Sequence, residues 1–116
     1  MYSSNVRKVL SVIVIGLGAV GTLMSVALLW QMPLVLTAVL VLISAFMLFY
    51  HKSKSVLFVY VFGFFFGPIT EIVAISHGAW SYAAPHLFGV PFWLPFVWGA
   101  ASITIISAYL YVKREQ

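Results

Sequence analysis

The sequence predicts an all-α membrane protein with four transmembrane helices. Of its 116 residues, 64% are hydrophobic and 7% are charged, whereas ordinary soluble domains are roughly 25% charged. A transmembrane helix needs about 20 mostly apolar residues. Four such stretches can be recognised, at residues 9–30, 34–50, 56–76 and 92–112. They take up nearly the whole chain, so we expect a single four-helix transmembrane domain over residues 1–116.

Lysine and arginine occur in three places only: before the first stretch, between the second and third, and after the fourth. They are Arg7, Lys8, Lys52, Lys54, Lys113 and Arg114. Four spans bring these places to one side of the membrane, and the connections 31–33 and 77–91 contain neither residue type. The positive-inside rule therefore predicts an N-in, C-in protein of the cytoplasmic membrane, with both termini cytoplasmic. The net charge of +4 is explained by topology, and no nucleic-acid partner is expected.

The first stretch carries small residues at helical spacing, Gly18, Thr22 and Ser25. Membrane helices approach one another closely along such faces, so we expect Gly18 to be a helix-packing residue. The connection of residues 31–33 is very short, which predicts an antiparallel hairpin of the first two helices. Pro33 suits the first turn of the second helix, where its missing N–H would be unpaired in any case.

The third stretch has glycine or glutamate at every fourth position, at Gly63, Gly67 and Glu71. These residues lie on one stripe of a helix, and the glycine pair lets a neighbouring helix approach closely. Pro68 lacks a backbone donor and predicts a kink or local opening. Thr70 can bond back to the backbone of its own helix.

Glu71 is the only acidic residue between the N-terminus and the last few residues. An ionisable group in a transmembrane helix usually faces the bundle interior and is a candidate functional residue. At about 1.5 Å per residue, Glu71 lies about 22 Å beyond Val56, nearer the outer side of a hydrocarbon core about 30 Å thick. The fourth stretch runs back inward and brings Trp98 to similar depth, with Gly99 as a further packing residue. We therefore expect a pocket formed by Glu71, Trp98 and the connection between the last two helices.

That connection is rich in aromatic residues and proline. Its aromatic residues suit an interfacial belt, and we predict that some of them surround Glu71. The predicted ligand-binding residues are Thr70, His77, Trp80, Tyr82, Trp93 and Trp98. His77 and His86 match no metal-ligand spacing and the chain has no cysteine, so neither a metal nor a cofactor is predicted. His51 is expected to be a surface residue.

Residues 71–98 contain an acid, then G-x-W-x-Y (Gly78, Trp80, Tyr82), G-V-P (89–91) and P-x-x-W (Pro95, Trp98). This block, about 30 of the 116 residues, resembles a block of the membrane-embedded carotenoid hydratases and, more loosely, of the lycopene-cyclase-type domains. The chain lacks the paired-glutamate element of the cyclase-type domains. The resemblance implies that Glu71 would be a catalytic acid that protonates an isoprenoid double bond. Aromatic residues would then stabilise the resulting cation.

Three classes of function fit these features. The first is a small membrane protein that binds a lipid or isoprenoid-like ligand in an outer-leaflet pocket at Glu71, with or without acid catalysis. The second is a non-catalytic accessory subunit of a larger membrane complex, with membrane proteins or further copies of the chain as partners besides membrane lipids. The third is a small proton-coupled transporter. We favour the first class, and the sequence leaves open whether the protein is an enzyme.

Overall fold

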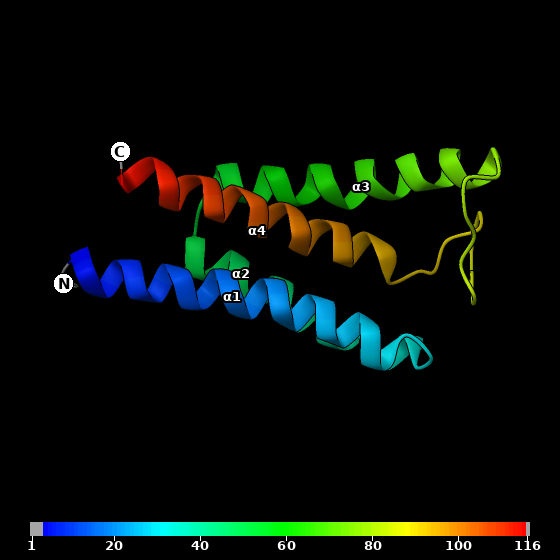
Figure 1. Cartoon of the computed structure of the whole chain (residues 1–116), viewed down its shortest axis with the longest axis horizontal. Helices are drawn as coiled ribbons and strands as arrows, with labels where there is room; N and C mark the ends of the chain where they lie inside the picture. Colours follow the sequence, from blue (N-terminus) through cyan, green and yellow to red (C-terminus); the bar gives the residue numbers. More distant parts are fainter. Residues whose placement is uncertain (1–3, 116) are drawn as a thin grey trace.

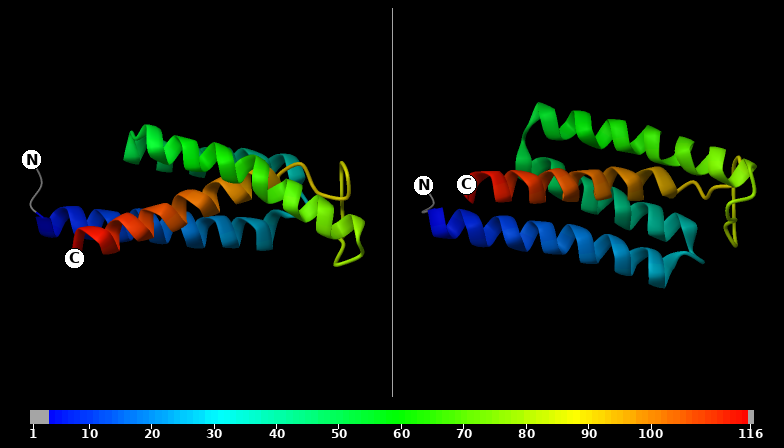
Figure 2. Two further views of the ribbon diagram at one scale, coloured as in Figure 1. Left: turned by 90° about the horizontal axis from the view of Figure 1, so that it is seen from above. Right: turned by 45° about the horizontal axis from the view of Figure 1, so that its top comes forward.

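A computed structural model describes residues 4–115, and the chain is helical through most of this range (Figure 1). The helices are α1 (Ser4–Leu29), α2 (Pro33–His51), α3 (Lys54–Ser76) and α4 (Leu94–Glu115). They run roughly along the long axis of a particle of 49 × 25 × 20 Å (Figure 2). Each of the four is long and apolar enough to cross a membrane. The predicted all-α class and its four apolar helices are therefore confirmed.

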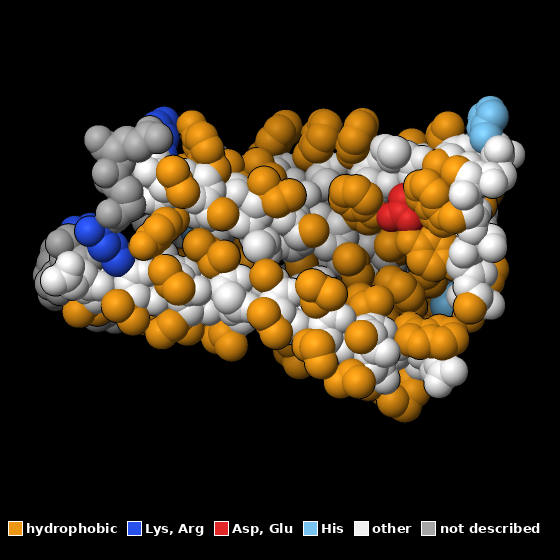
Figure 3. All heavy atoms as spheres, in the orientation of Figure 1, with side chains coloured by type: hydrophobic (Ala, Val, Ile, Leu, Met, Phe, Trp, Pro, Cys, Tyr) orange, Lys and Arg blue, Asp and Glu red, His pale blue; other side chains and the backbone are white. Residues whose placement is uncertain are grey.

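The two ends of the bundle differ in composition. One end carries the N-terminus of α1, the α2–α3 connection and the C-terminus of α4, and we call it the basic end. The other, which we call the loop end, carries the α1–α2 turn and the long α3–α4 connection. Figure 3 shows basic side chains at the basic end, and an acidic side chain among hydrophobic ones toward the loop end.

Short capping interactions set where α2 and α3 meet. Pro33 opens α2, as predicted. The helix ends at His51 and is capped by Lys52, which has a left-handed backbone and whose N–H donates to the Leu48 carbonyl at 3.0 Å. The next residue, Ser53, caps α3 by accepting a hydrogen bond from the Val56 N–H at 3.3 Å. These caps satisfy backbone groups that would otherwise be unpaired at the helix ends.

Two expectations about the helices are corrected. The fourth helix begins at Leu94 and not at residue 92, because Pro95 fits the first turn of a helix but would clash with a carbonyl four residues earlier in a longer one. A kink or a local opening was expected at Pro68, and the local opening does not occur, because α3 continues without interruption through this residue. Membrane helices tolerate proline where neighbouring helices pack around it, and Pro68 is buried. Thr70 bonds back to the Phe66 carbonyl at 2.9 Å, as expected.

Helix α4 is the centre of the bundle. It packs against all three other helices, whereas α1 and α3 are not in contact within the described range. Most of the buried hydrophobic residues form two clusters. The loop-end cluster comprises Leu36, Leu40, Val90, Trp93 and Leu94. The basic-end cluster comprises Met47, Val56, Tyr60 and Ile103.

The four glycines predicted as helix-packing residues each lie against a side chain of another helix. At each of them, a Cβ atom would overlap that side chain. The pairs are Gly18 with Met47, Gly63 with Ser102, Gly67 with Trp98 and Gly99 with Tyr60. Three of these pairs join α3 to α4, which explains why these two helices pack most closely.

Hydroxyl groups connect the helices toward the basic end. The Tyr60 hydroxyl on α3 donates to Ser44 Oγ on α2 at 2.8 Å. His51 Nε2, at the end of α2, lies 2.6 Å from Ser107 Oγ on α4. His51 is therefore half-buried and bonded to another helix, and its prediction as a surface residue was wrong.

Candidate functional site

Glu71 is half-buried on α3, and each of its carboxylate oxygens accepts a hydrogen bond. The Tyr82 hydroxyl donates to one oxygen, and the Trp98 indole N–H donates to the other. The three residues come from α3, the α3–α4 connection and α4. We call them the Glu71 cluster, since this carboxylate joins three separate segments of the chain.

Trp98 reaches Glu71 because Gly67 leaves room for its indole ring. Gly67 lies one helical turn before Glu71 on the same stripe of α3. The indole of Trp98 occupies the space in which a Cβ atom of residue 67 would lie. The glycine at position 67 is therefore part of the site, although it offers no functional group.

Tyr82 is held against Glu71 by the connection that follows α3. Its ring makes an edge-to-face contact with Trp93, with 6.3 Å between the ring centroids. Burial raises the pKa of Tyr82, and the hydrogen bond to Glu71 and the charge of Glu71 raise this pKa further. The phenol consequently stays protonated at neutral pH and remains a hydrogen-bond donor.

The second half of the connection folds back into the bundle. Val90, Pro91 and Trp93 are buried, and Val90 and Trp93 belong to the loop-end cluster. The chain reverses through Phe88 and Gly89, whose φ angles are 53° and 86°. Gly89 adopts its angle without strain, whereas a positive φ is uncommon for a bulky residue such as Phe88. The Phe92 N–H donates to His86 Nδ1 at 3.1 Å and holds the reversed segment. The reversed segment holds Trp93 in place, and Trp93 in turn holds the ring of Tyr82.

The other predicted ligand-binding residues do not surround Glu71. Thr70 is exposed and bonds to its own helix. It does not share the side of α3 that carries Glu71, because consecutive residues of a helix point in different directions. His77 is exposed, with Nδ1 at 2.9 Å from the Val73 carbonyl. Trp80 is 48% exposed and forms no hydrogen bond to Glu71. Trp93 is 6% exposed and supports Tyr82 as a buried residue. Of the predicted set, only Tyr82 and Trp98 meet the carboxylate.

Within residues 4–115, no three His, Asp or Glu side chains come close enough together to hold a metal ion. The two histidines of the connection are separately engaged, His77 with its own helix and His86 with the Phe92 N–H. The site is thus a carboxylate held by two neutral donors.

A cavity of about 220 Å³ lies next to Tyr82, beneath the connection. It is lined by Val26, Trp30, Tyr82, Ala83, Ala84, Pro91 and Trp93. Tyr82 therefore contacts both Glu71 and this largely apolar space. The contribution of Trp30 was not predicted from the sequence. Its position in the sequence could have indicated this contribution, because Trp30 lies beside the α1–α2 turn, at the same end of the bundle as the α3–α4 connection.

An ionised carboxylate offers about four lone-pair positions for hydrogen bonds, and Tyr82 and Trp98 use two of them. The half-exposed position of Glu71 leaves it reachable from outside the bundle. The cluster can therefore accept a further hydrogen bond from a hydroxyl or amine group of a ligand, while the aromatic rings contact its apolar part.

Comparison of the chain with protein-family models, with curated proteins and with solved structures finds no match. A fold of this kind hosts many functions, so the function has to be argued from the Glu71 cluster itself.

Proposed function

We propose that the chain is an integral membrane protein that binds the polar end of a lipid-like or isoprenoid-like molecule at the Glu71 cluster. One observation carries this proposal: a carboxylate in a membrane-length helix is held by donors from two other segments and keeps lone pairs free. Acidic residues are costly in a membrane and are usually functional where they occur. Glu71 lies five residues before the end of α3, or about 8 Å along the axis, close to headgroup depth.

The proposed orientation places the basic end in the cytoplasm and the loop end on the outer face. Arg7, Lys8, Lys52, Lys54 and Lys113 lie on the elements that form the basic end. No Lys or Arg lies between residues 77 and 93 at the loop end. This asymmetry is the one that the positive-inside rule describes.

The orientation predicts the outcome of a reporter fusion. A phosphatase that is active only outside the cytoplasm, inserted at Ala84, is expected to be active, and the same reporter after Lys52 is expected to be inactive. Alkylation of single cysteines at the same positions by a membrane-impermeant maleimide checks the result without a bulky fusion. A reporter at Ala84 that stayed cytoplasmic would overturn the proposed topology.

The cluster favours an amphiphile with a hydrogen-bond donor at one end. The free lone pairs of Glu71 accept a hydroxyl or amine proton. The neighbouring cavity offers an apolar wall of Val26, Trp30 and Pro91.

A narrower form of the proposal, suggested by the resemblance to carotenoid hydratases, makes Glu71 an acid that protonates a double bond. Among the described side chains there is no second acidic residue that could assist Glu71 in proton transfer. We therefore favour ligand binding over acid catalysis.

Native mass spectrometry tests this proposal. Full-length protein, gently extracted from its own membrane, is compared with Glu71→Gln and with the control Thr70→Val, whose hydroxyl bonds only to α3. We expect a small apolar molecule bound to wild type and to Thr70→Val and lost from Glu71→Gln. The proposal is wrong if all three variants carry the same molecules in the same amounts.

A second candidate function, the accessory subunit, is supported by the outer face of α3. Phe58, Phe62 and Phe66 stack along this face, and all three are more than half exposed. Because α3 packs mainly on α4, a helix of another membrane protein has room to pack on this side. The same mass spectra distinguish this function, since larger protein partners unaffected by Glu71→Gln would support it.

A further inference from the structure

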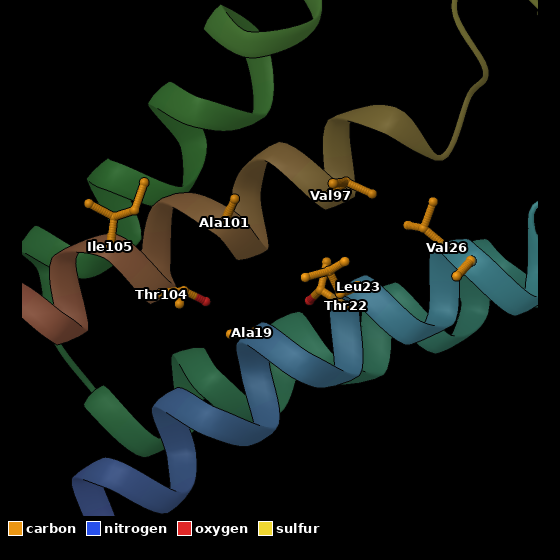
Figure 4. Close-up of a pocket in the computed structure, with 9 residues that line it drawn as sticks. Ala19, Thr22, Leu23, Val26, Val97, Ala101, Thr104 and Ile105 are labelled. Carbon is orange, nitrogen blue, oxygen red and sulfur yellow. The ribbon is translucent and has the colours of Figure 1, made fainter.

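A groove that none of the predicted functions uses lies away from Glu71, between α1 and α4. It is a groove of about 520 Å³, and Figure 4 shows side chains of the two helices on either side of it. It is lined by Ala19, Thr22, Leu23, Val26, Ala27, Val97, Ala101, Thr104 and Ile105. None of these residues is a hydrogen-bond partner of Glu71. The groove is therefore distinct from the Glu71 cluster, although it shares Val26 with the cavity beside Tyr82.

The groove is open on the side that would face lipid. All its lining residues come from α1 and α4, and neither α2 nor α3 contributes one. It extends along α1 from Ala19 to Ala27, about 12 Å at the rise of a helix. Val26 lines both this groove and the cavity beneath the connection, so the groove leads toward the loop end. Its shape suits an elongated molecule lying along the helices.

One hydroxyl group bordering the groove has no hydrogen-bond partner. Among the buried side-chain nitrogen and oxygen atoms of the described residues, only Thr22 Oγ1 lacks a hydrogen-bond partner. Thr22 as a whole is 8% exposed. Leaving a buried hydroxyl unpaired is unfavourable, and there is no water in a hydrocarbon region to compensate.

Other hydroxyls of the bundle do not share this property. Thr104, across the groove, donates to the Ala100 carbonyl at 2.9 Å. Ser25, one turn along α1, donates to the Gly21 carbonyl at 2.5 Å. Thr22 makes no such bond. Because threonine populates two rotamers in helices, a change of rotamer exchanges its methyl and hydroxyl positions beside the groove. An oxygen atom in the groove would then accept the hydrogen bond that Thr22 lacks.

We propose that the α1–α4 groove binds a single-chain lipid that carries a carbonyl or hydroxyl oxygen, with the chain lying along α1 and the oxygen accepting a hydrogen bond from Thr22. The apolar walls bury the chain, and the small side chains Ala19, Ala27 and Ala101 leave the width that the chain needs. The volume lies within the usual range for small-molecule sites, about 300–1,000 Å³. A lipid of this class reaches the groove from the bilayer, without passing Glu71.

Photolabelling tests this proposal on the full-length protein in nanodiscs of saturated phosphatidylcholine. Two probes with the same chain and the same diazirine are compared, one a long-chain fatty alcohol and the other the matched hydrocarbon without oxygen. We expect the alcohol to label α1 and α4 residues of the groove about fivefold more than the hydrocarbon, the preference given by one hydrogen bond.

Four variants assign the effect. Thr22→Val, which keeps the side-chain shape, is expected to abolish the preference for the alcohol. Thr104→Val, in the same groove, is expected to keep it, because its hydroxyl already bonds to Ala100. Ala101→Leu fills the groove and is expected to reduce labelling by both probes. Glu71→Gln is expected to leave groove labelling unchanged, so failure of the proposed function does not affect this test.

The proposal is overturned if Thr22→Val retains the preference, which would mean that Thr22 simply bonds back to its own helix in the membrane. It is also overturned if the probes label the groove no more than the outer face of α3. Cross-linking of the groove to a helix of a co-purified protein, in place of lipid, would likewise show that the occupant is a protein.

Discussion

Replacing Glu71 with leucine is expected to destabilise the protein by about 1–3 kcal/mol. The change leaves the Tyr82 hydroxyl and the Trp98 indole N–H without their acceptor, and unpaired polar groups of this kind cost about 1–3 kcal/mol each in proteins. Measured interhelical hydrogen bonds in membranes are weaker, about 0.6 kcal/mol on average, so two of them give about 1.2 kcal/mol, and the expected total lies between this value and the cost of one fully unpaired group. Reversible unfolding in mixed micelles, followed by tryptophan fluorescence, gives the free energy of unfolding.

Two controls separate the hydrogen bonds from the loss of charge. Glu71→Gln keeps an oxygen for Trp98 and offers an amide donor to the Tyr82 hydroxyl, which can also accept. We therefore expect it to unfold much like wild type. Thr70→Val, on the neighbouring position, is expected to change the free energy of unfolding by less than about 0.5 kcal/mol, as surface substitutions do. If Glu71→Leu were as stable as Thr70→Val, the carboxylate would not join the three segments.

Replacing Gly67 with alanine is expected to cost about 1–3 kcal/mol, the range for forcing extra volume into a packed interface. The new methyl group would overlap the indole ring of Trp98, and a rigid ring on a packed helix cannot bend away. Either α3 moves from α4 or Trp98 leaves Glu71. The same unfolding measurement reports the loss of stability. A fall in bound ligand in native mass spectra reports the disturbance of the site.

Gly16→Ala is the matched control for this variant. It also lies in the interior of a helix, but a Cβ atom at this position would have no neighbour within 4 Å. We expect Gly16→Ala to be neutral or to stabilise the protein by up to about 1 kcal/mol, through the higher helix propensity of alanine. Equal effects of the two alanines would show that Trp98 does not occupy the space above Gly67.

The four helices could be predicted because apolar length is a property of the local sequence. The boundaries were less accurate where tertiary packing decides. Proline is a local signal, yet Pro95 opens α4 and Pro68 lies inside α3. The difference comes from the surroundings, since Pro68 is buried against neighbouring segments.

The site was predicted in part for similar reasons. Glu71 stands out because an acid is costly in an apolar stretch, and antiparallel helices bring Trp98 to its depth. Which residue of the connection would reach Glu71 could not be predicted, because this depends on the reversal at Phe88 and Gly89 and on the packing of Trp93. Thr22 was recognised as a small residue, but its missing hydrogen-bond partner depends on the spacing of α1 and α4.

The central claim, that Glu71 binds the polar end of a ligand, is tested most directly by an experimental structure of the full chain in nanodiscs made from its own membrane lipids. We predict elongated density that ends within hydrogen-bond distance of a Glu71 oxygen, about 2.5–3.2 Å, with Tyr82 and Trp98 still bonded to the carboxylate. A carboxylate in contact with Tyr82 and Trp98 alone, with no density beside it, would contradict the claim and would make Glu71 a structural residue.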